Sequence, residues 1–181
     1  MKDGIRVLGI DDAAFEFEAE ETFLTGVIYR GTEFVEDIES IKVEVDGEDA
    51  TEKVLELYEN TSNHKQLKAI LTDGIAFAGF NLIDIEKVSE ATGKPVVAVT
   101  KNEPHREKFM KAMRKTENYD RAFERFDDPI EVELEDGSCF IQFSGCTERE
   151  ARSLVKKNII QGQVPESIRV ADMVGTALNH E

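Results

Sequence analysis

The first part of the chain is a series of apolar and alternating runs. Residues 5–10 (IRVLGI) are apolar and rich in β-branched side chains, which is typical of a central strand. Residues 23–31 and 38–47 follow after short connections, and the second run alternates apolar and polar positions. Short links between consecutive strands favour antiparallel neighbours. The pattern therefore predicts an antiparallel meander of three strands.

After the meander, the pattern alternates between helical and strand periods. We expect helices over residues 49–60, 78–92 and 104–115, and buried strands over residues 67–74 and 95–100. Such alternation indicates parallel strands joined by right-handed crossovers. The fourth strand would then lie against the free side of the first strand, where the strand order reverses.

The last third of the chain has a different pattern. Residues 130–145 form two alternating runs around an Asp-Gly pair, which predicts a β-hairpin. A helix is expected over residues 147–160, opened by Thr147 with Glu150 at the capping-box position. A second helix is expected over residues 164–178. We therefore predict an α/β core closed by a C-terminal hairpin and helices.

The composition agrees with one domain spanning residues 1–181. The hydrophobic fraction is 40%, which is ordinary for a globular protein. No apolar run approaches the roughly 20 residues of a membrane helix, and the N-terminal segment lacks the layout of a signal peptide. We expect a cytoplasmic protein without membrane contact. The pattern does not indicate an oligomeric state.

The charge is strongly acidic, with 38 acidic and 22 basic side chains and a formal net charge of −16. Such a charge opposes non-specific binding to nucleic acid, because phosphate contacts need cations. It also suits a surface adapted to heat or salt. Residues 101–115 are the exception, with six bases against two acids. A phosphate backbone would be tolerated best along Lys101 to Lys115, although a solvated helix face explains the same pattern.

Two acids stand at the ends of predicted strands. Asp11 ends the first strand and Asp73 ends the fourth. If these strands are parallel neighbours, both side chains emerge at the carboxyl edge of the sheet, where ligands of open α/β sheets bind. Neighbouring carboxylates repel each other, and a divalent cation removes that repulsion. The alternative is that both acids simply begin loops.

A third acid would come from residues 46–49. Asp46, Glu48 and Asp49 are the candidates, and Asp49 is also placed to cap the following helix, because Glu52 stands three residues later. Lys101 follows the strand over residues 95–100 and so lies at the same edge of the sheet.

The chain resembles endonuclease V, within the ribonuclease H-like superfamily, and resembles more closely an uncharacterised archaeal family related to that enzyme. Four short motifs carry the resemblance, in the family's order: GIDD, ILTDG, KPVVAVTK and VPESIRVAD, at residues 9–12, 70–74, 94–101 and 164–172. The resemblance implies a ribonuclease H-like mixed sheet, with a three-strand antiparallel meander plus parallel strands, flanked by helices.

The resemblance also implies an activity. The family cleaves a phosphodiester near a deaminated base with an activated water, and the superfamily uses two Mg²⁺ ions roughly 4 Å apart. We therefore expect Mg²⁺ or Mn²⁺ as the cofactor. Carried over, Asp11 and Asp73 bind metal, and Asp49 (or Asp46) takes the place of the family's glutamate after the third strand. Lys101 contacts phosphate.

The sequence departs from endonuclease V at three places. Residues 33–45 contain neither the proline nor the tyrosine of the family's wedge motif, and IAFAGFN (residues 75–81) replaces an H-P-R stretch. Cys146 stands where the family has a histidine or an acid, and thiolate sulfur suits softer metals than Mg²⁺. The leading expectation is a metal-dependent endonuclease acting on DNA or RNA. The alternatives are a catalytically reduced nucleic-acid-binding or regulatory protein and a phosphohydrolase acting on nucleotides.

Overall fold

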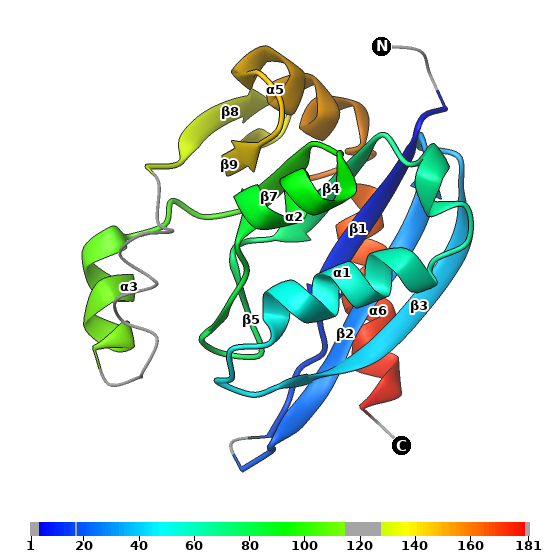
Figure 1. The fold of residues 1–181 in the computed structure, drawn as a ribbon. Coiled ribbons are helices and arrows are strands. Elements are labelled where there is room, and N and C mark those ends of the chain that lie inside the picture. The colour runs from blue at the N-terminus through cyan, green and yellow to red at the C-terminus, as the bar shows by residue number, and fades with distance from the viewer. Residues whose placement is uncertain (1–3, 17, 115–127, 180–181) are drawn as a thin grey trace.

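A seven-stranded mixed sheet forms the centre of the protein (Figure 1). The computed structural model describes residues 4–16, 18–114 and 128–179. The strand order is β3-β2-β1-β4-β7-β9-β8. The strands are β1 (Arg6–Asp12), β2 (Glu21–Arg30), β3 (Phe34–Glu44), β4 (Ala69–Asp73), β7 (Val96–Thr100), β8 (Ile130–Leu134) and β9 (Gly137–Ser144).

The strand directions confirm the predicted ribonuclease H-like arrangement. β1, β2 and β3 pair as an antiparallel meander, and β4 pairs with the free side of β1 in parallel. β7 is parallel to β4, and the hairpin of β8 and β9 continues the sheet antiparallel to β7. The strand order therefore reverses between β1 and β4, as the sequence pattern predicts.

Helices cover both faces of the sheet. On one face, α1 (Ala50–Asn60) and α2 (Ile85–Thr92) bury a core around Leu8, Ile70 and Leu57. On the other face, α5 (Glu148–Lys157) and α6 (Glu166–Leu178) bury a second core around Leu71 and Ile168. A short 3₁₀ helix, η1 (His64–Gln66), precedes β4. The two cores hold the strands rigidly, so that the strand ends are well placed to carry a site.

The helix predicted over residues 78–92 begins seven residues later in the structure, at Ile85. A two-stranded hairpin, β5 (Ala76–Phe77) and β6 (Asn81–Leu82), occupies this region, and α2 starts only at Ile85. The turn of the hairpin places Ala78 at φ 44° and Gly79 at φ 85°, in the left-handed region that a right-handed helix excludes. The side chain of Asp84 caps α2 by accepting a hydrogen bond from Lys87 N.

Helix α3 (Arg106–Met113) lies beside the sheet and packs on this hairpin (Figure 1). Met110 and Met113 are buried against Leu82, with Phe80 and Phe109 packed around them. The Phe80 and Phe109 rings are tilted, with centroids 6.5 Å apart. Met110 and Met113 thus form the inward face of this helix, whereas Lys108 and Lys111 are exposed on its outer face.

Helix α6 approaches β1 unusually closely. A Cβ atom on Gly9 would lie 2.4 Å from the carbonyl carbon of Ser167, and a Cβ on Gly175 would lie 3.1 Å from the Cα of Ala13. There is no room for a side chain at Gly9, and a Cβ on Gly175 would require a small shift of Ala13. These contacts set the position of α6 along β1, and with it the position of every side chain that α6 carries.

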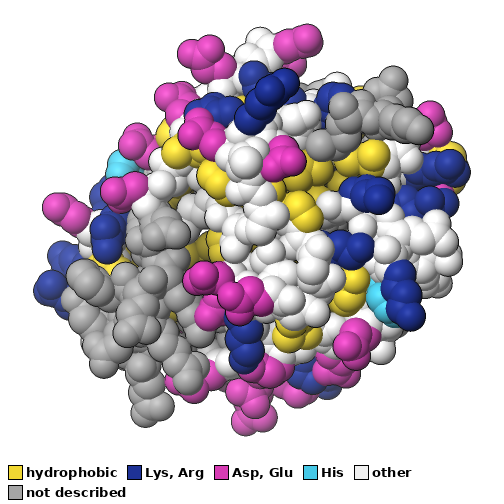
Figure 2. Space-filling view, turned by 45° about the horizontal axis from the view of Figure 1, so that its top comes forward, with side chains coloured by type: hydrophobic (Ala, Val, Ile, Leu, Met, Phe, Trp, Pro, Cys, Tyr) yellow, Lys and Arg dark blue, Asp and Glu magenta, His cyan; other side chains and the backbone are white. Residues whose placement is uncertain are grey.

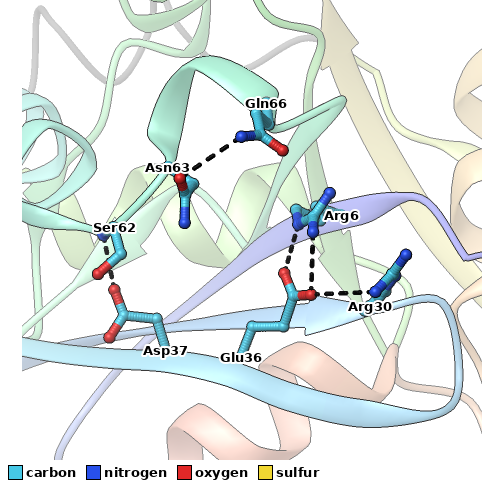
Figure 3. Close-up of polar contacts among 7 residues, drawn as sticks. All are labelled: Arg6, Arg30, Glu36, Asp37, Ser62, Asn63 and Gln66. Carbon is cyan, nitrogen blue, oxygen red and sulfur yellow. Dashed lines mark hydrogen bonds and ion pairs between the residues drawn. The ribbon is translucent and has the colours of Figure 1, made fainter.

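Ion pairs join the strands at the other end of β1. Glu36 on β3 accepts hydrogen bonds from Arg6 on β1 and lies 3.6 Å from Arg30 Nη1 on β2 (Figure 3). The neighbouring Asp37 accepts a hydrogen bond of 2.6 Å from the backbone N–H of Ser62, just after α1. These contacts attach the edge strand β3 to β1, β2 and the end of α1.

The surface is densely charged. Figure 2 shows acidic side chains spread over the visible face among Lys and Arg side chains. Within the part of the chain that the structure describes, no helix is long and apolar enough to cross a membrane.

Candidate functional site

The two strand-end acids lie on neighbouring parallel strands. Ile10 on β1 is paired with Thr72 on β4, and Asp11 and Asp73 follow one residue later on each strand. Asp11 is buried, with 7% of its surface exposed, whereas Asp73 is exposed at the end of its strand. The structure therefore places both predicted acids at the carboxyl edge, where the strand order reverses.

Asp11 is the most perturbed acid of this group. Desolvation by burial and the charges of Asp73 and Asp12 raise its pKa from the ordinary 3.8 to about 9, and Asp172 adds a smaller contribution. A hydrogen bond of 2.9 Å from the backbone N–H of Asp12 to Asp11 Oδ1 opposes this shift. In the metal-free protein, Asp11 is therefore largely protonated at neutral pH.

Asp12 and Asp73 are perturbed in the same direction. Desolvation and the charges of Asp12 and Asp172 raise the pKa of Asp73 to about 6. Desolvation also raises the pKa of Asp12, although its Oδ2 accepts a hydrogen bond of 3.0 Å from Ala78 N. The carboxylates thus form one electrostatically coupled group, in which each additional negative charge is unfavourable.

The fourth member of this group is Asp172, which our sequence analysis did not assign to the site. It is an exposed residue of α6, and its charge raises the pKa of Asp11, Asp12 and Asp73. Its signal in the sequence was the last position of VPESIRVAD, a motif that we used only for the resemblance. The close contacts of Gly9 and Gly175 with α6 explain how a helix from the C-terminus brings an acid to the end of β1.

The two candidates for the third acid lie in a hydrogen-bond network around the β5–β6 hairpin. Asp49 Oδ1 accepts hydrogen bonds of 2.6 Å from Asn81 Nδ2 and 3.3 Å from Glu44 N. Asp46 Oδ1 accepts a hydrogen bond of 2.9 Å from Phe80 N. Both carboxylates therefore have defined hydrogen-bond partners in this network, and neither is among the acids that raise the pKa of Asp11 or Asp73.

The predicted capping role of Asp49 is wrong. Its side chain makes no capping hydrogen bond to α1. The buried side chain of Asn81 fills this role, because its Oδ1 accepts a hydrogen bond of 2.9 Å from Ala50 N. By contrast, the predicted capping box of Thr147 and Glu150 at the start of α5 is confirmed, with both reciprocal hydrogen bonds present.

Lys101 is exposed immediately after β7. Because β7 is the parallel neighbour of β4 and pairs Val99 with Asp73, Lys101 stands at the same edge of the sheet as the acids. The exposed Lys108 and Lys111 continue the basic segment along α3. Lys115, the last residue of the predicted basic segment, lies outside the described residues.

Cys146 lies just after β9 and is half-buried against the core under α5 and α6. Burial and the charge of Glu150 raise the pKa of its thiol. The side chain is therefore a neutral thiol at physiological pH, and a neutral thiol is a poor ligand for Mg²⁺. The other cysteine, Cys139, is buried on β9, and neither cysteine forms a disulfide.

The donor set fits a hard divalent cation in part. Carboxylate oxygens are the ligands that Mg²⁺ and Mn²⁺ prefer, and relief of the repulsion at Asp11 would favour binding. Within the described ranges, however, no three His, Cys, Asp or Glu side chains are arranged to enclose an ion. Mg²⁺ sites commonly use one or two carboxylates with water and substrate phosphate as the other ligands. Asp11 and Asp73 fit a site of this kind.

The mixed sheet, with helices on both faces, is a ribonuclease H-like fold of the kind seen in endonuclease V. The chain belongs to the endonuclease dU family, whose model matches residues 3–179. A UPF0215 protein of Methanopyrus kandleri is 34% identical over 186 residues, covering 98% of this chain and 93% of the relative. A UPF0215 protein of Archaeoglobus fulgidus is 35% identical over 175 residues, covering 97% and 94%.

Solved structures agree with this family. A protein of unknown function from Archaeoglobus fulgidus has a TM-score of 0.87 at 34% identity, over 98% of this chain and 99% of that chain. Human endonuclease V has a TM-score of 0.65 at 17% identity, over 98% of this chain and 84% of that chain. Endonuclease V from Ciona intestinalis, solved with an inosine-containing DNA, has a TM-score of 0.64 at 14% identity, over 95% and 84%. The predicted relation to an archaeal family and to endonuclease V is confirmed.

Proposed function

We propose that this protein is a divalent-metal-dependent endonuclease that hydrolyses phosphodiester bonds in nucleic acid. The observation that carries the proposal is the coupled pair at the sheet edge, where the charge of Asp73 contributes to raising the pKa of Asp11. Burying an acid beside other acids is costly unless a cation compensates for it. Membership in the endonuclease dU family supports a nuclease-like function for such a site.

Asp11 and Asp73 are the proposed ligands of Mg²⁺ or Mn²⁺. When bound, the cation would activate a water molecule and neutralise charge on the phosphate. We propose Asp172 as the third acid, because its charge raises the pKa of both Asp11 and Asp73. Asp49, the third ligand predicted from the sequence, would first have to exchange its hydrogen bond from Asn81.

The remaining residues bind and orient the substrate. Lys101 is proposed to contact a phosphate, because it stands at the carboxyl edge of β7 beside Asp73. The exposed Lys108 and Lys111 on α3 would continue the contact along the nucleic-acid backbone. Asp12 has a positioning role, because it donates its backbone N–H to Asp11 and accepts a hydrogen bond from Ala78.

The experiment that tests this proposal is a cleavage assay on a substrate panel. Labelled single-stranded and duplex DNA, the same DNA containing deoxyuridine, RNA and free nucleotides are incubated with Mg²⁺ or Mn²⁺. The family's name makes deoxyuridine the first nucleoside to test. We expect metal-dependent internal cleavage by the wild type and by Glu90→Gln, an exposed acid on α2, and none by Asp73→Asn. Release of phosphate from nucleotides alone would instead favour the phosphohydrolase.

A non-catalytic nucleic-acid-binding protein is the second candidate. One observation favours it: the described residues contain no preassembled three-ligand group. The resemblance adds that Cys146 stands where endonuclease V has a histidine or an acid, either of which suits Mg²⁺ better than sulfur does. Binding of the panel's nucleic acids that is equally strong with EDTA and with Mn²⁺, without any cleavage, would support this candidate.

A further inference from the structure

An exposed aromatic ring follows the first acids of the site closely in the sequence. Phe15 follows Asp11 by four residues, in the connection between β1 and β2, and 37% of its surface is exposed. Burying a phenylalanine is worth about 1.5–3 kcal/mol, so an exposed ring forgoes a considerable gain.

The ring lies next to a turn that contacts Asp12. Phe15 Cζ lies 3.7 Å from the position that a Cβ atom on Gly79 would occupy. The preceding residue of the same turn, Ala78, donates its N–H to Asp12 Oδ2. Gly79 itself has φ 85°, and a Cβ there would meet Asp46 Oδ1 at 2.3 Å. The turn therefore lies between the ring and Asp12, the chain neighbour of Asp11.

Phe15 also lines a shallow hollow of about 600 Å³. The other side chains around this hollow include Glu16, Glu18 and Glu21. Carboxylates repel a phosphate and accept hydrogen bonds from N–H groups. Of the parts of a nucleotide, the base therefore suits this hollow better than the backbone does, whereas the backbone is better placed towards Lys101.

We propose that Phe15 stacks on an unpaired nucleobase of the strand whose phosphodiester lies at Asp11 and Asp73. This inference rests on the proposed nuclease function and specifies its substrate as a single-stranded or extruded nucleotide. A base inside a duplex has both faces covered by its neighbours, so a side chain can stack on it only after it has left the helix. Aromatic stacking of this kind tolerates every base, because each has a π-face.

The chain offers a matched control at Phe34. This ring is 47% exposed at the start of β3 and lies 5.8 Å from the guanidinium of Arg30. Arg30 is paired with Arg6 at the beginning of β1, the opposite end of that strand from Asp11. Phe34 therefore has comparable exposure but no proximity to the acids.

The test uses tryptophan fluorescence, because the sequence contains no tryptophan. Phe15→Trp and Phe34→Trp are each titrated with an unlabelled oligodeoxyuridine and with an unlabelled abasic oligomer of equal length and charge. Ca²⁺ replaces Mg²⁺ to favour binding over cleavage, and a gel checks that the oligonucleotide remains intact. Anisotropy of labelled copies of both oligomers measures binding by the wild type and by Phe15→Ala.

We expect the base-bearing oligomer to quench Phe15→Trp, whereas the abasic oligomer leaves it unchanged and Phe34→Trp responds to neither. Phe15→Ala should bind the base-bearing oligomer at least about fivefold more weakly and the abasic oligomer equally well. Binding by anisotropy without base-dependent quenching, or an unchanged affinity of Phe15→Ala, overturns the inference while the nuclease proposal stands. Absence of binding to any nucleic acid of the panel overturns both. The Phe15→Ala measurement decides the matter if Phe15→Trp does not fold.

Discussion

Asp11 and Asp73 end neighbouring parallel strands, and their electrostatic relationship is asymmetric. The charge of Asp73 raises the pKa of the buried Asp11, which rises to about 9, whereas the pKa of the more exposed Asp73 rises to about 6. Asp73 therefore ionises first, and Asp11 keeps its proton over a wide pH range. A metal ion that binds both carboxylates must displace this proton, so metal binding should release a proton.

The first prediction concerns stability against pH in the absence of metal. Unfolded Asp11 loses its proton near its ordinary pKa of 3.8, whereas folded Asp11 keeps it up to about pH 9. The folded state therefore binds more protons over this interval, so the free energy of unfolding falls as pH rises. We expect Asp11→Asn to flatten this fall, measured as Tm in EDTA from about pH 5 to pH 9. Glu90→Gln is the control, and a slope that Asp11→Asn leaves unchanged would contradict the assignment.

The second prediction concerns Asp172. Replacing it with asparagine removes a negative charge that acts on the three other acids. If Asp172 helps to hold the cation, Asp172→Asn should raise the Mn²⁺ concentration for half-maximal cleavage by about 10-fold to 100-fold. Saturating Mn²⁺ should restore part of the rate. If Asp172→Asn and Glu90→Gln have the same metal dependence, Asp172 has no part in the site.

The third prediction concerns the contact between β1 and α6. Gly9→Ala would place a Cβ 2.4 Å from the backbone of Ser167, and a backbone atom cannot give way cheaply. We expect the free energy of unfolding, measured in urea, to fall by about 1–3 kcal/mol. The cleavage rate should fall as well, because α6 carries Asp172. Gly93→Ala, at the left-handed residue after α2, is the comparison. It should lower stability without changing the metal dependence, and a Gly9→Ala protein of wild-type stability would refute the close packing.

The fourth prediction concerns the capping box of α5. Thr147→Ala removes the hydroxyl that accepts a hydrogen bond from Glu150 N, and should cost about 0.5–2 kcal/mol of unfolding free energy. Ser153→Ala in the middle of the same helix serves as the control, because alanine favours a helix more than serine does. Equal effects of the two substitutions in urea unfolding would show that the cap does not stabilise the helix.

Local patterns predicted the sheet well, because the central strands β1, β4 and β7 are continuous buried apolar runs and short connections limit the possible pairings. The meander, the position of β4 beside β1 and the C-terminal hairpin all follow from such signals. The capping box of Thr147 and Glu150 was also readable, since both partners lie within one helical turn. Together these elements place Asp11 and Asp73 at one edge.

The remaining features depend on contacts between residues far apart in the sequence. The N–H of Ala78 donates a hydrogen bond to Asp12, 66 positions away, and this contact is made in a hairpin turn. A prediction from the local helical pattern therefore placed the start of α2 too early. Asn81 caps α1 across 31 positions, and a local pattern therefore favoured Asp49. Asp172 reaches the site only because Gly9 and Gly175 let α6 approach β1 closely.

The most direct test of the central claim is calorimetric titration of the metal-free protein with Mn²⁺ near neutral pH, repeated in two buffers that differ in ionisation enthalpy. The account predicts binding to the wild type with release of about one proton, because Asp11 must ionise to act as a ligand. Mn²⁺ binding to Asp11→Asn should release no proton from this site, and Asp73→Asn should bind Mn²⁺ more weakly. Glu90→Gln should behave as the wild type. Absence of binding to the wild type, or the same proton release from Asp11→Asn, would contradict the account.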